Sequence, residues 1–261
     1  MAIHLRPSVI NNIMQLPQLK DAKHKAWLYR ILSALYDDPF LAGNLYFKGG
    51  TCAAMLGYLD RFSVDLDFDF AGSKTDLFKA REKMEKIFDD LGLAIKDQSQ
   101  KVPQYFLRYP AKEGERNTVK IDMTFPIIEA DRYETKRFSE IDRIITCQTP
   151  ETMFANKLVA LIDRYKKKSG IAGRDVYDVH YFFENSFEYD KAVIEARTGQ
   201  QPKKFFEELV SFVEDKVTNE IIAQDLNVLL PYDKFKTIRK TLKQETLMFL
   251  RDEIKRLGKE K

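Results

Sequence analysis

Apolar residues recur every three or four positions near the N-terminus and throughout the second half of the chain, which is the spacing of helices with one buried face. Between these parts, apolar and polar residues alternate over short segments, as in strands that bury one face. The helical spacing and its capping residues predict helices over 22–36, 51–59, 73–91, 150–167, 174–184, 189–197, 202–216, 220–223 and 232–257. The alternation and one short apolar run predict strands over 45–47, 63–70, 102–109 and 118–125.

The change from alternating to helical spacing occurs at Thr149-Pro150, where a capping residue precedes a proline suited to the first helical turn. This division predicts an α/β (α+β) protein with a small mixed sheet in residues 1–148 and a helical bundle in residues 149–261. A chain of 261 residues is long enough for one large domain or two of ordinary size.

Three carboxylates share one face of the strand predicted over 63–70. Because side chains alternate along a strand, Asp65, Asp67 and Asp69 lie opposite the apolar side chains of this segment. Carboxylates this close repel one another and lose hydration when covered, so the face needs a compensating cation. A hard divalent ion, which prefers oxygen ligands, fits best. A solvent-facing sheet edge is the alternative explanation.

A further carboxylate has the same placement on the strand predicted over 118–125, where Asp122 lies opposite the apolar residues. If the two acidic strands are neighbours, Asp122 completes a set with Asp65 and Asp67. Metal ions held by such a set stabilise the charge that develops on a phosphoryl group during nucleotidyl transfer. In that arrangement Asp122 would lie nearest the attacking hydroxyl.

A Gly-Gly-Thr turn precedes the acidic strand. Gly49 and Gly50 leave room for a phosphate to approach backbone N–H groups, and the hydroxyl of Thr51 adds a donor. Taken alone, such a turn is an ordinary tight connection. Next to a strand that holds a metal ion, it indicates a site for a triphosphate.

Composition and charge exclude several classes of protein. Only Cys52 and Cys147 are present, so a disulfide framework and a cysteine-rich zinc site are excluded. The chain lacks an apolar run of the ~18 residues that a membrane span needs and shows no secretory signal, so we expect a cytoplasmic protein that binds no membrane. The net charge is only +3, but residues 234–261 carry ten Lys or Arg against four Asp or Glu. This tail suits an RNA backbone, with a solvated helix face as the alternative.

The acidic strand and the glycine turn together resemble a known signature. The runs FKGGT and RFSVDLDF, with Tyr58 between them, match the pattern KGGT…Y…RxSxDxD of the AbiEii/AbiGii-type toxin nucleotidyltransferases. A later block, ETMFANKLVALIDR followed by RDVYD, is similar to the second block of that family. The resemblance covers residues 46–183 and implies a DNA-polymerase-β-like nucleotidyltransferase fold with an appended helical domain.

The resemblance implies roles for single residues. Asp65 and Asp67 would bind Mg²⁺, with Mn²⁺ as an alternative and Asp122 as the candidate third ligand. The residues expected to take part in catalysis are Asp65, Asp67, Asp122, Lys157, Asp175 and Asp178. The residues expected to bind the NTP are Lys48, Gly49, Gly50, Thr51, Arg61, Ser63 and Lys157. Lys157 would reach across the cleft as a mobile charge on phosphate.

The features together predict a Mg²⁺-dependent nucleotidyltransferase of the toxin–antitoxin or abortive-infection type. It would move an NMP from an NTP to an acceptor such as tRNA, and a cognate antitoxin would be its partner. One alternative is transfer to a hydroxyl of a small molecule or protein, which a shallow acidic cleft would favour. Another is a catalytically silent nucleotide-binding module, which tight NTP binding without pyrophosphate release would favour.

Overall fold

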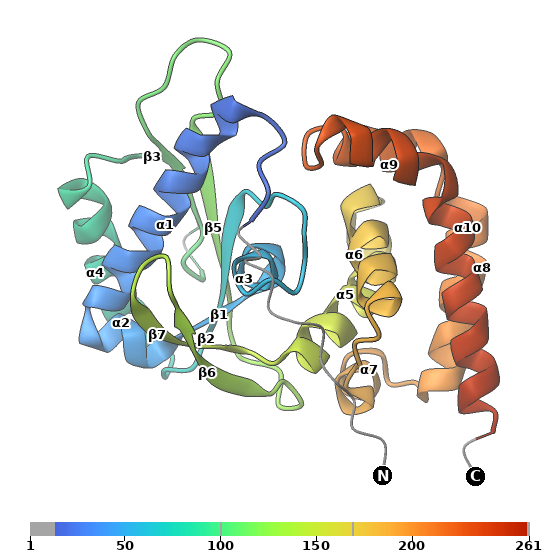
Figure 1. Cartoon of the computed structure of the whole chain (residues 1–261). Coiled ribbons are helices and arrows are strands. Elements are labelled where there is room, and N and C mark those ends of the chain that lie inside the picture. Colours follow the sequence, from blue (N-terminus) through green and yellow to red (C-terminus); the bar gives the residue numbers. More distant parts are fainter. Residues whose placement is uncertain (1–13, 100, 169, 260–261) are drawn as a thin grey trace.

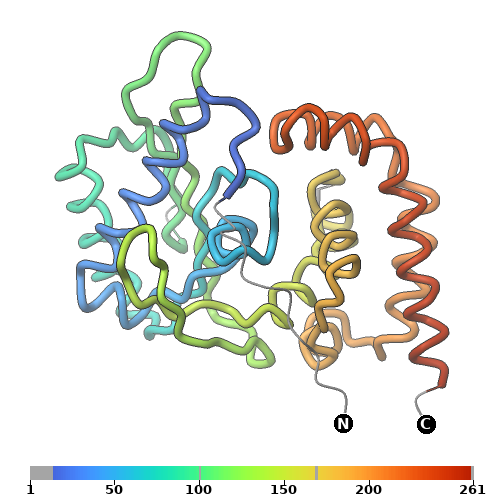
Figure 2. The backbone as a smooth tube through the Cα atoms, in the orientation of Figure 1, coloured from blue at the N-terminus to red at the C-terminus, as the bar shows by residue number. Residues whose placement is uncertain are grey.

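The strands and the C-terminal helices occupy opposite sides of the molecule (Figure 1), and the chain passes from one side to the other through α5 (Figure 2). The computed structural model describes residues 14–99, 101–168 and 170–259. The helices on the sheet side are α1 (Ala22–Asp37), α2 (Pro39–Asn44), α3 (Gly49–Met55) and α4 (Asp76–Asp90). The helices on the other side are α5 (Pro150–Lys168), α6 (Gly173–Glu184), α7 (Lys191–Thr198), α8 (Pro202–Lys216), α9 (Asn219–Leu226) and α10 (Tyr232–Leu257).

The described part of the chain forms one mixed sheet in the order β3-β4-β5-β2-β1-β7-β6. The strands are β1 (Leu45–Lys48), β2 (Asp65–Phe70), β3 (Ala94–Gln98), β4 (Tyr105–Arg108), β5 (Thr118–Thr124), β6 (Tyr133–Phe138) and β7 (Arg143–Gln148). Strand β2 runs antiparallel to β1 and parallel to β5. This pairing places Asp67 opposite Lys48 on one side and opposite Asp122 on the other. The two acidic strands are therefore neighbours, and the predicted α/β class is confirmed.

The core lies under the apolar face of β2. Leu66, Phe68 and Phe70 are buried there, and Phe68 packs against Phe47 of β1 with ring centroids 5.3 Å apart. Helix α1 adds Tyr36, whose ring lies 6.5 Å from that of Phe68. A buried side chain of this size contributes about 1.5–3 kcal/mol relative to an exposed one. Since a slip of one residue would expose the whole apolar set, the core fixes the face on which the acidic residues lie.

Contacts join the segment before β2 to the C-terminal helices. The backbone N–H of Phe62 donates to the carbonyl of Leu229 at 2.9 Å, and the hydroxyl of Tyr177 donates to Asp60 at 2.6 Å. The transition from sheet to helices falls where it was predicted, between β7 and α5. The division into separate domains, 1–148 and 149–261, stays a prediction, and residues 1–13 lie outside the described ranges. No described helix combines the length and the apolar character needed to cross a bilayer.

The structure corrects several predicted elements. The helix expected over 51–59 is Gly49–Met55, and the strand expected over 63–70 is shortened to Asp65–Phe70. Strands β3, β6 and β7 were not predicted. Every residue of β3 is exposed, and most of β6 is only partly buried, so neither strand has an apolar face that the sequence could show.

Candidate active site

The Gly-Gly turn lies directly against the acidic strand. Gly49 begins α3 with a φ of +80°, in the left-handed region. A Cβ atom added to Gly49 would lie 2.3 Å from Oδ2 of Asp67, and one added to Gly50 would lie 2.7 Å from Nη2 of Arg61. Because these distances are far below van der Waals contact, only glycines allow the turn to approach the two side chains so closely.

The Asp65 and Asp67 carboxylates carry negative charge that nearby lysines and arginines compensate only in part. Burial, followed by repulsion from Asp65 and Asp122, raises the pKa of Asp67 to about 6. Burial also raises the pKa of Asp65, although the positive charge of Arg174 opposes the change. Within the described ranges, no side chain donates a hydrogen bond to either carboxylate. This face of the sheet therefore favours a ligand that brings positive charge.

Asp122 is held differently from the other two carboxylates. It accepts a hydrogen bond from Nε2 of Gln104 at 3.0 Å and forms an ion pair with Lys120. Accordingly, the described residues contain no group of three His, Cys, Asp or Glu side chains already arranged around a metal position. Asp65 and Asp67 still fit a hard cation, because such an ion takes its remaining ligands from water and phosphate. Asp122 would join them only after leaving Lys120.

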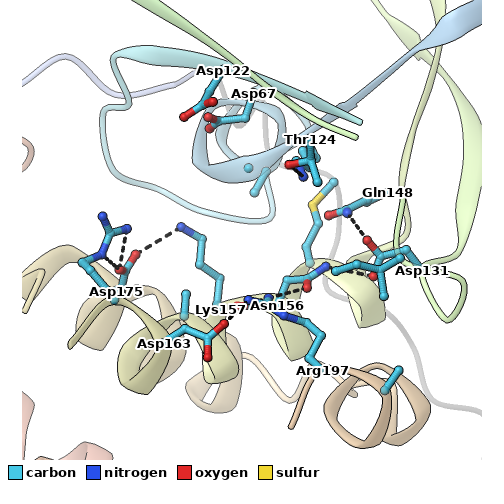
Figure 3. A pocket seen from close by; sticks show the side chains of 18 of the residues that line it. Asp67, Asp122, Thr124, Asp131, Gln148, Asn156, Lys157, Asp163, Asp175 and Arg197 are labelled. Carbon is cyan, nitrogen blue, oxygen red and sulfur yellow. Dashed lines mark hydrogen bonds and ion pairs between the residues drawn. The ribbon is translucent and has the colours of Figure 1, made fainter. Parts of the chain in front are cut away.

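Helix α5 brings Lys157 to the opposite wall of the cleft, where it extends toward the acidic strands (Figure 3). Its Nζ lies 2.8 Å from Oδ2 of Asp178 and 3.4 Å from Oδ1 of Asp175, both on α6. Nη2 of Arg164 lies 3.1 Å from the second oxygen of Asp175. The structure thus brings Lys157, Asp175 and Asp178 together, and the two buried carboxylates hold the lysine in place.

Arg61 lies in a different setting from the one expected of a triphosphate ligand. Its side chain is buried, and Nε and Nη2 bind the two oxygens of Asp178 at 2.5 and 2.7 Å. Burial disfavours both charges, but their mutual attraction outweighs it, so the pKa of Arg61 is raised and that of Asp178 is lowered. The remaining Nη1 donates to the carbonyl of Phe62. Arg61 therefore fastens the loop before β2 to α6, and its side chain also borders the smaller cavity, so its role as a nucleotide ligand stays a prediction.

Two other predicted nucleotide ligands are also engaged within the protein. Nζ of Lys48 binds Oδ1 of Asp69 at 2.5 Å. Thr51 is completely buried, and its hydroxyl donates to the backbone carbonyl of Asp65, which supports the start of β2. Ser63 is 9% exposed and faces the cleft beside the glycine turn. Of the predicted hydroxyl donors, only Ser63 is placed to meet a phosphate.

Two connected cavities make up the cleft. The smaller has a volume of about 170 Å³, and the glycine turn, Ser63, Asp65, Lys120 and Arg174 lie along it. The larger, of about 630 Å³, lies between the sheet and helices α5 and α7 (Figure 3). The residues that line both cavities are Gly49, Asp67, Asp122, Lys157, Arg164 and Asp175.

Parts of this cleft were not predicted from the sequence. Arg174 belongs to the second block of the resemblance but was given no role in the site, because its spacing from Asp178 suits an ordinary surface pair. The far wall of the larger cavity includes Asp131, Gln148, Asn156 and Arg197. These residues come from a loop, the end of a strand and two helices, so no spacing in the sequence connects them.

The fold occurs in solved structures of other proteins. JHP933 from Helicobacter pylori superposes with a TM-score of 0.58 and 21% identity, covering 94% of this chain and 96% of that one. A second Helicobacter pylori protein gives a TM-score of 0.61 and 19% identity, with coverages of 94% and 99%. MenT4, a nucleotidyltransferase toxin from Mycobacterium tuberculosis H37Rv, gives 0.50 and 18%, with coverages of 94% and 89%. At identities this low, the superpositions show that the fold is shared and carry no information about activity. None of the curated proteins matches the chain in sequence.

The adjacent carboxylates beside a glycine turn suit a nucleotidyltransferase, and the family match shows that class. A model of the family described as nucleotidyl transferase AbiEii toxin, type IV TA system, matches residues 30–243. The chain therefore belongs to the AbiEii nucleotidyltransferase toxin family, and the resemblance described above is confirmed. Membership implies an NTP as substrate and an antitoxin as partner.

Gly49→Ala is expected to lower both stability and activity. A side chain in the left-handed region costs roughly 1–2 kcal/mol, and the new methyl group displaces the Asp67 carboxylate. A displacement of about 1 Å can lower a rate about 100-fold. The matched control is Gly92→Ala, where φ is +69° and nothing lies within 4 Å of the added Cβ. Thermal unfolding and a transfer assay on both variants test the idea, and equal activities would contradict it.

Proposed function

We propose that this nucleotidyltransferase moves an NMP from a Mg²⁺-bound NTP to a terminal hydroxyl of RNA in the cytoplasm, with tRNA as the first acceptor to test. The observation that supports the proposal is the pair of incompletely compensated carboxylates, Asp65 and Asp67, facing a cleft whose other wall supplies Lys157. Uncompensated charge in a partly buried site is unfavourable. A metal-bound triphosphate supplies the missing cations and carries the anions that Lys157 attracts.

In this proposal the triphosphate occupies the smaller cavity. Backbone N–H groups of the glycine turn and the hydroxyl of Ser63 donate to its oxygens, while Lys120 and Arg174 contribute positive charge. Asp65 and Asp67 would hold the divalent metal, for which Mg²⁺ is the best fit and Mn²⁺ the alternative. The bound metal would neutralise charge that develops on the transferring phosphoryl group.

The reaction replaces a phosphoanhydride bond of the NTP by a phosphodiester bond to the acceptor. The acceptor hydroxyl oxygen forms a bond to the α-phosphorus while the bond from that phosphorus to the β-bridging oxygen breaks, and pyrophosphate leaves. Asp122, the strand neighbour of Asp67, would accept the hydroxyl proton once released from Lys120. Lys157 stabilises the negative charge on the α-phosphate from the opposite wall.

Basic side chains of α5 and α10 provide a candidate surface for the acceptor, and one of them, Lys167, also lines the larger cavity. Helix α10 exposes Lys236, Arg239 and Lys240, and α5 exposes Lys166 and Lys167. Contacts between these side chains and phosphates would release counterions, so RNA affinity should fall steeply as salt is raised. Binding that does not change with salt concentration would exclude this surface as the RNA site.

The first experiment incubates purified protein with total tRNA, Mg²⁺ and each α-³²P-labelled NTP in turn. The Asp65→Ala/Asp67→Ala variant and a sample with excess EDTA are the controls. Label that enters RNA only with wild-type protein and metal would support the proposal. No label, but release of pyrophosphate with a small molecule or protein acceptor, would replace RNA by another acceptor. Binding of NTP with no pyrophosphate release under any condition would leave only a nucleotide-binding role.

Lys157→Ala is expected to lower kcat/KM for transfer on the order of 100-fold, because the α-phosphate loses the charge that faces it. Lys86→Ala provides the control, since Lys86 is an exposed lysine of α4, on the sheet side. Thermal unfolding of both variants separates a catalytic loss from a loss of fold, because Lys157 also compensates Asp178. Wild-type activity in a folded Lys157→Ala protein would remove Lys157 from the mechanism.

A further inference from the structure

The larger cavity has the size and walls of a nucleoside site. Its volume of about 630 Å³ lies within the range of small-molecule pockets, roughly 300–1,000 Å³. Ile128, Met153, Ala160 and Phe182 provide apolar wall, which the smaller cavity largely lacks. The two cavities meet at Asp67. A triphosphate in the smaller cavity would therefore extend its ribose and base into the larger one, an inference that rests on the function proposed above.

Gln148, at the end of β7, has its amide held in one orientation. Its Nε2 donates to Oδ2 of Asp69 and to Oδ2 of Asp131, both at 2.9 Å. A rotated amide would place its oxygen against these two carboxylates, and the repulsion excludes that rotamer. The nitrogen is turned toward Asp131 (Figure 3), and within the described ranges no group donates to Oε1. The residue is only 2% exposed, so this acceptor is fixed in the wall of the cavity.

The two carboxylates that hold the amide are themselves fixed. Oδ1 of Asp69 accepts from Lys48 at 2.5 Å, and its Oδ2 also accepts from the hydroxyl of Tyr133 at 3.0 Å. Oδ1 of Asp131 accepts from Nδ2 of Asn156 at 3.2 Å. Both carboxylates thus only accept hydrogen bonds from their neighbours. The amide of Gln148 can therefore satisfy its N–H groups only with its nitrogen turned toward them. The free carbonyl is a consequence of the whole network.

We propose that Oε1 of Gln148 accepts a hydrogen bond from the exocyclic amino group of the donor base, so that ATP and CTP are preferred over GTP and UTP. Adenine and cytosine carry an amino group where guanine and uracil carry a carbonyl oxygen. A carbonyl facing a fixed acceptor leaves both oxygens without a donor. The hydroxyl of Thr124 accepts from Lys48 at 2.8 Å and keeps its proton for the neighbouring ring nitrogen, an acceptor in these two bases.

Titration of the wild-type protein with each NTP, with Ca²⁺ in place of Mg²⁺ to prevent turnover, tests the preference. ATP and CTP should bind at least about tenfold more tightly than GTP and UTP, and ITP should bind more weakly than ATP by a similar factor. Equal affinities for the four NTPs, whether or not they match that of inorganic triphosphate, or a preference for GTP or UTP, would overturn base recognition by Gln148. Neither result would contradict the proposed nucleotidyl transfer. Binding of no NTP would overturn the proposed function as well.

Gln148→Met keeps the length of the side chain and removes the acceptor. The ratio of ATP to ITP affinity should fall to near one, while the affinity for inorganic triphosphate stays unchanged. Lys157→Ala is the matched control, since it should weaken all NTPs alike and preserve the ratio. An unchanged ratio in folded Gln148→Met protein would overturn the role of Gln148. If loss of the amide unfolds the protein, the comparison of ATP with ITP on wild-type protein decides the question.

Discussion

Asp67→Asn is expected to abolish nucleotidyl transfer and at the same time to stabilise the protein at neutral pH. Transfer should fall on the order of 10³-fold or more, because the variant loses a metal-binding oxygen at the reacting phosphate. Stability should rise because the carboxylate at this position is repelled by Asp65 and Asp122 and is partly removed from water. We expect a gain of about 1–3 kcal/mol, the lower values reflecting the solvent contact that Asp67 retains.

The gain should depend on pH in a defined direction. The pKa of Asp67 rises from an ordinary value of 3.8 to about 6 in the folded protein. The folded state therefore binds more protons than the unfolded state between these values, and the stability of the wild type falls as pH rises through them. Asparagine has no such dependence. Tm values of the two proteins should agree near pH 4 and separate up to about pH 7, which differential scanning calorimetry measures directly.

Asp69→Asn is the matched control on the same strand. Asp69 is completely buried but accepts hydrogen bonds from Lys48, Tyr133 and Gln148. Its replacement leaves the half-buried Lys48 without its anion and the other donors without an ionised acceptor, and should cost about 2–3 kcal/mol. The two neighbouring substitutions should thus change stability in opposite directions. A loss of stability in Asp67→Asn comparable to that in Asp69→Asn would show that Asp67 is compensated within the protein, and would remove the main argument for a bound cation.

The position of the acidic strands was predictable from sequence because the core determines it. Alternation of apolar and polar residues over β2 and β5 gave each strand a buried face, and the acids followed on the other. Edge strand β6 carries mostly charged residues that reach solvent, so it has no such pattern. Long helices such as α8 and α10 were predicted with their bounds, since each has one buried apolar stripe and a proline at or before its first residue.

The roles of single polar residues were less predictable than their positions. The signature names Arg61 as a nucleotide ligand, which stays a prediction, but it gives no sign of the buried pair with Asp178. That partner lies 117 residues away in sequence, and only the packing of α6 brings the two together. The orientation of the Gln148 amide was likewise not predictable from the sequence, because it depends on Asp69 and Asp131, which lie far from it in the chain or in a loop. Periodicity reports which face a side chain occupies. It does not report which partners long-range packing brings to that face.

Asp178 connects the two walls of the cleft, because it binds Arg61 from the loop before β2 and Lys157 from α5. Its side chain is completely buried, so solvent cannot replace either partner. One carboxylate thus sets the distance between the loop that leads to the metal-binding strand and the lysine that faces the phosphate. Stability should depend on Asp178 because it compensates the buried Arg61, and activity because it positions Lys157.

Asp178→Ala is therefore expected to lower the free energy of unfolding by about 3–5 kcal/mol, since it leaves the buried guanidinium of Arg61 without its anion. Urea denaturation measures the loss. Arg137→Ala, which breaks an exposed pair whose side chains are both 72% accessible, should cost less than about 1 kcal/mol. The double variant Arg61→Met/Asp178→Leu should recover much of the stability, because no charge is then left buried. It should stay poorly active, since Lys157 has lost the nearer of its two carboxylates and keeps only Asp175, at 3.4 Å. Recovery of activity together with stability would show that Asp178 serves the fold alone.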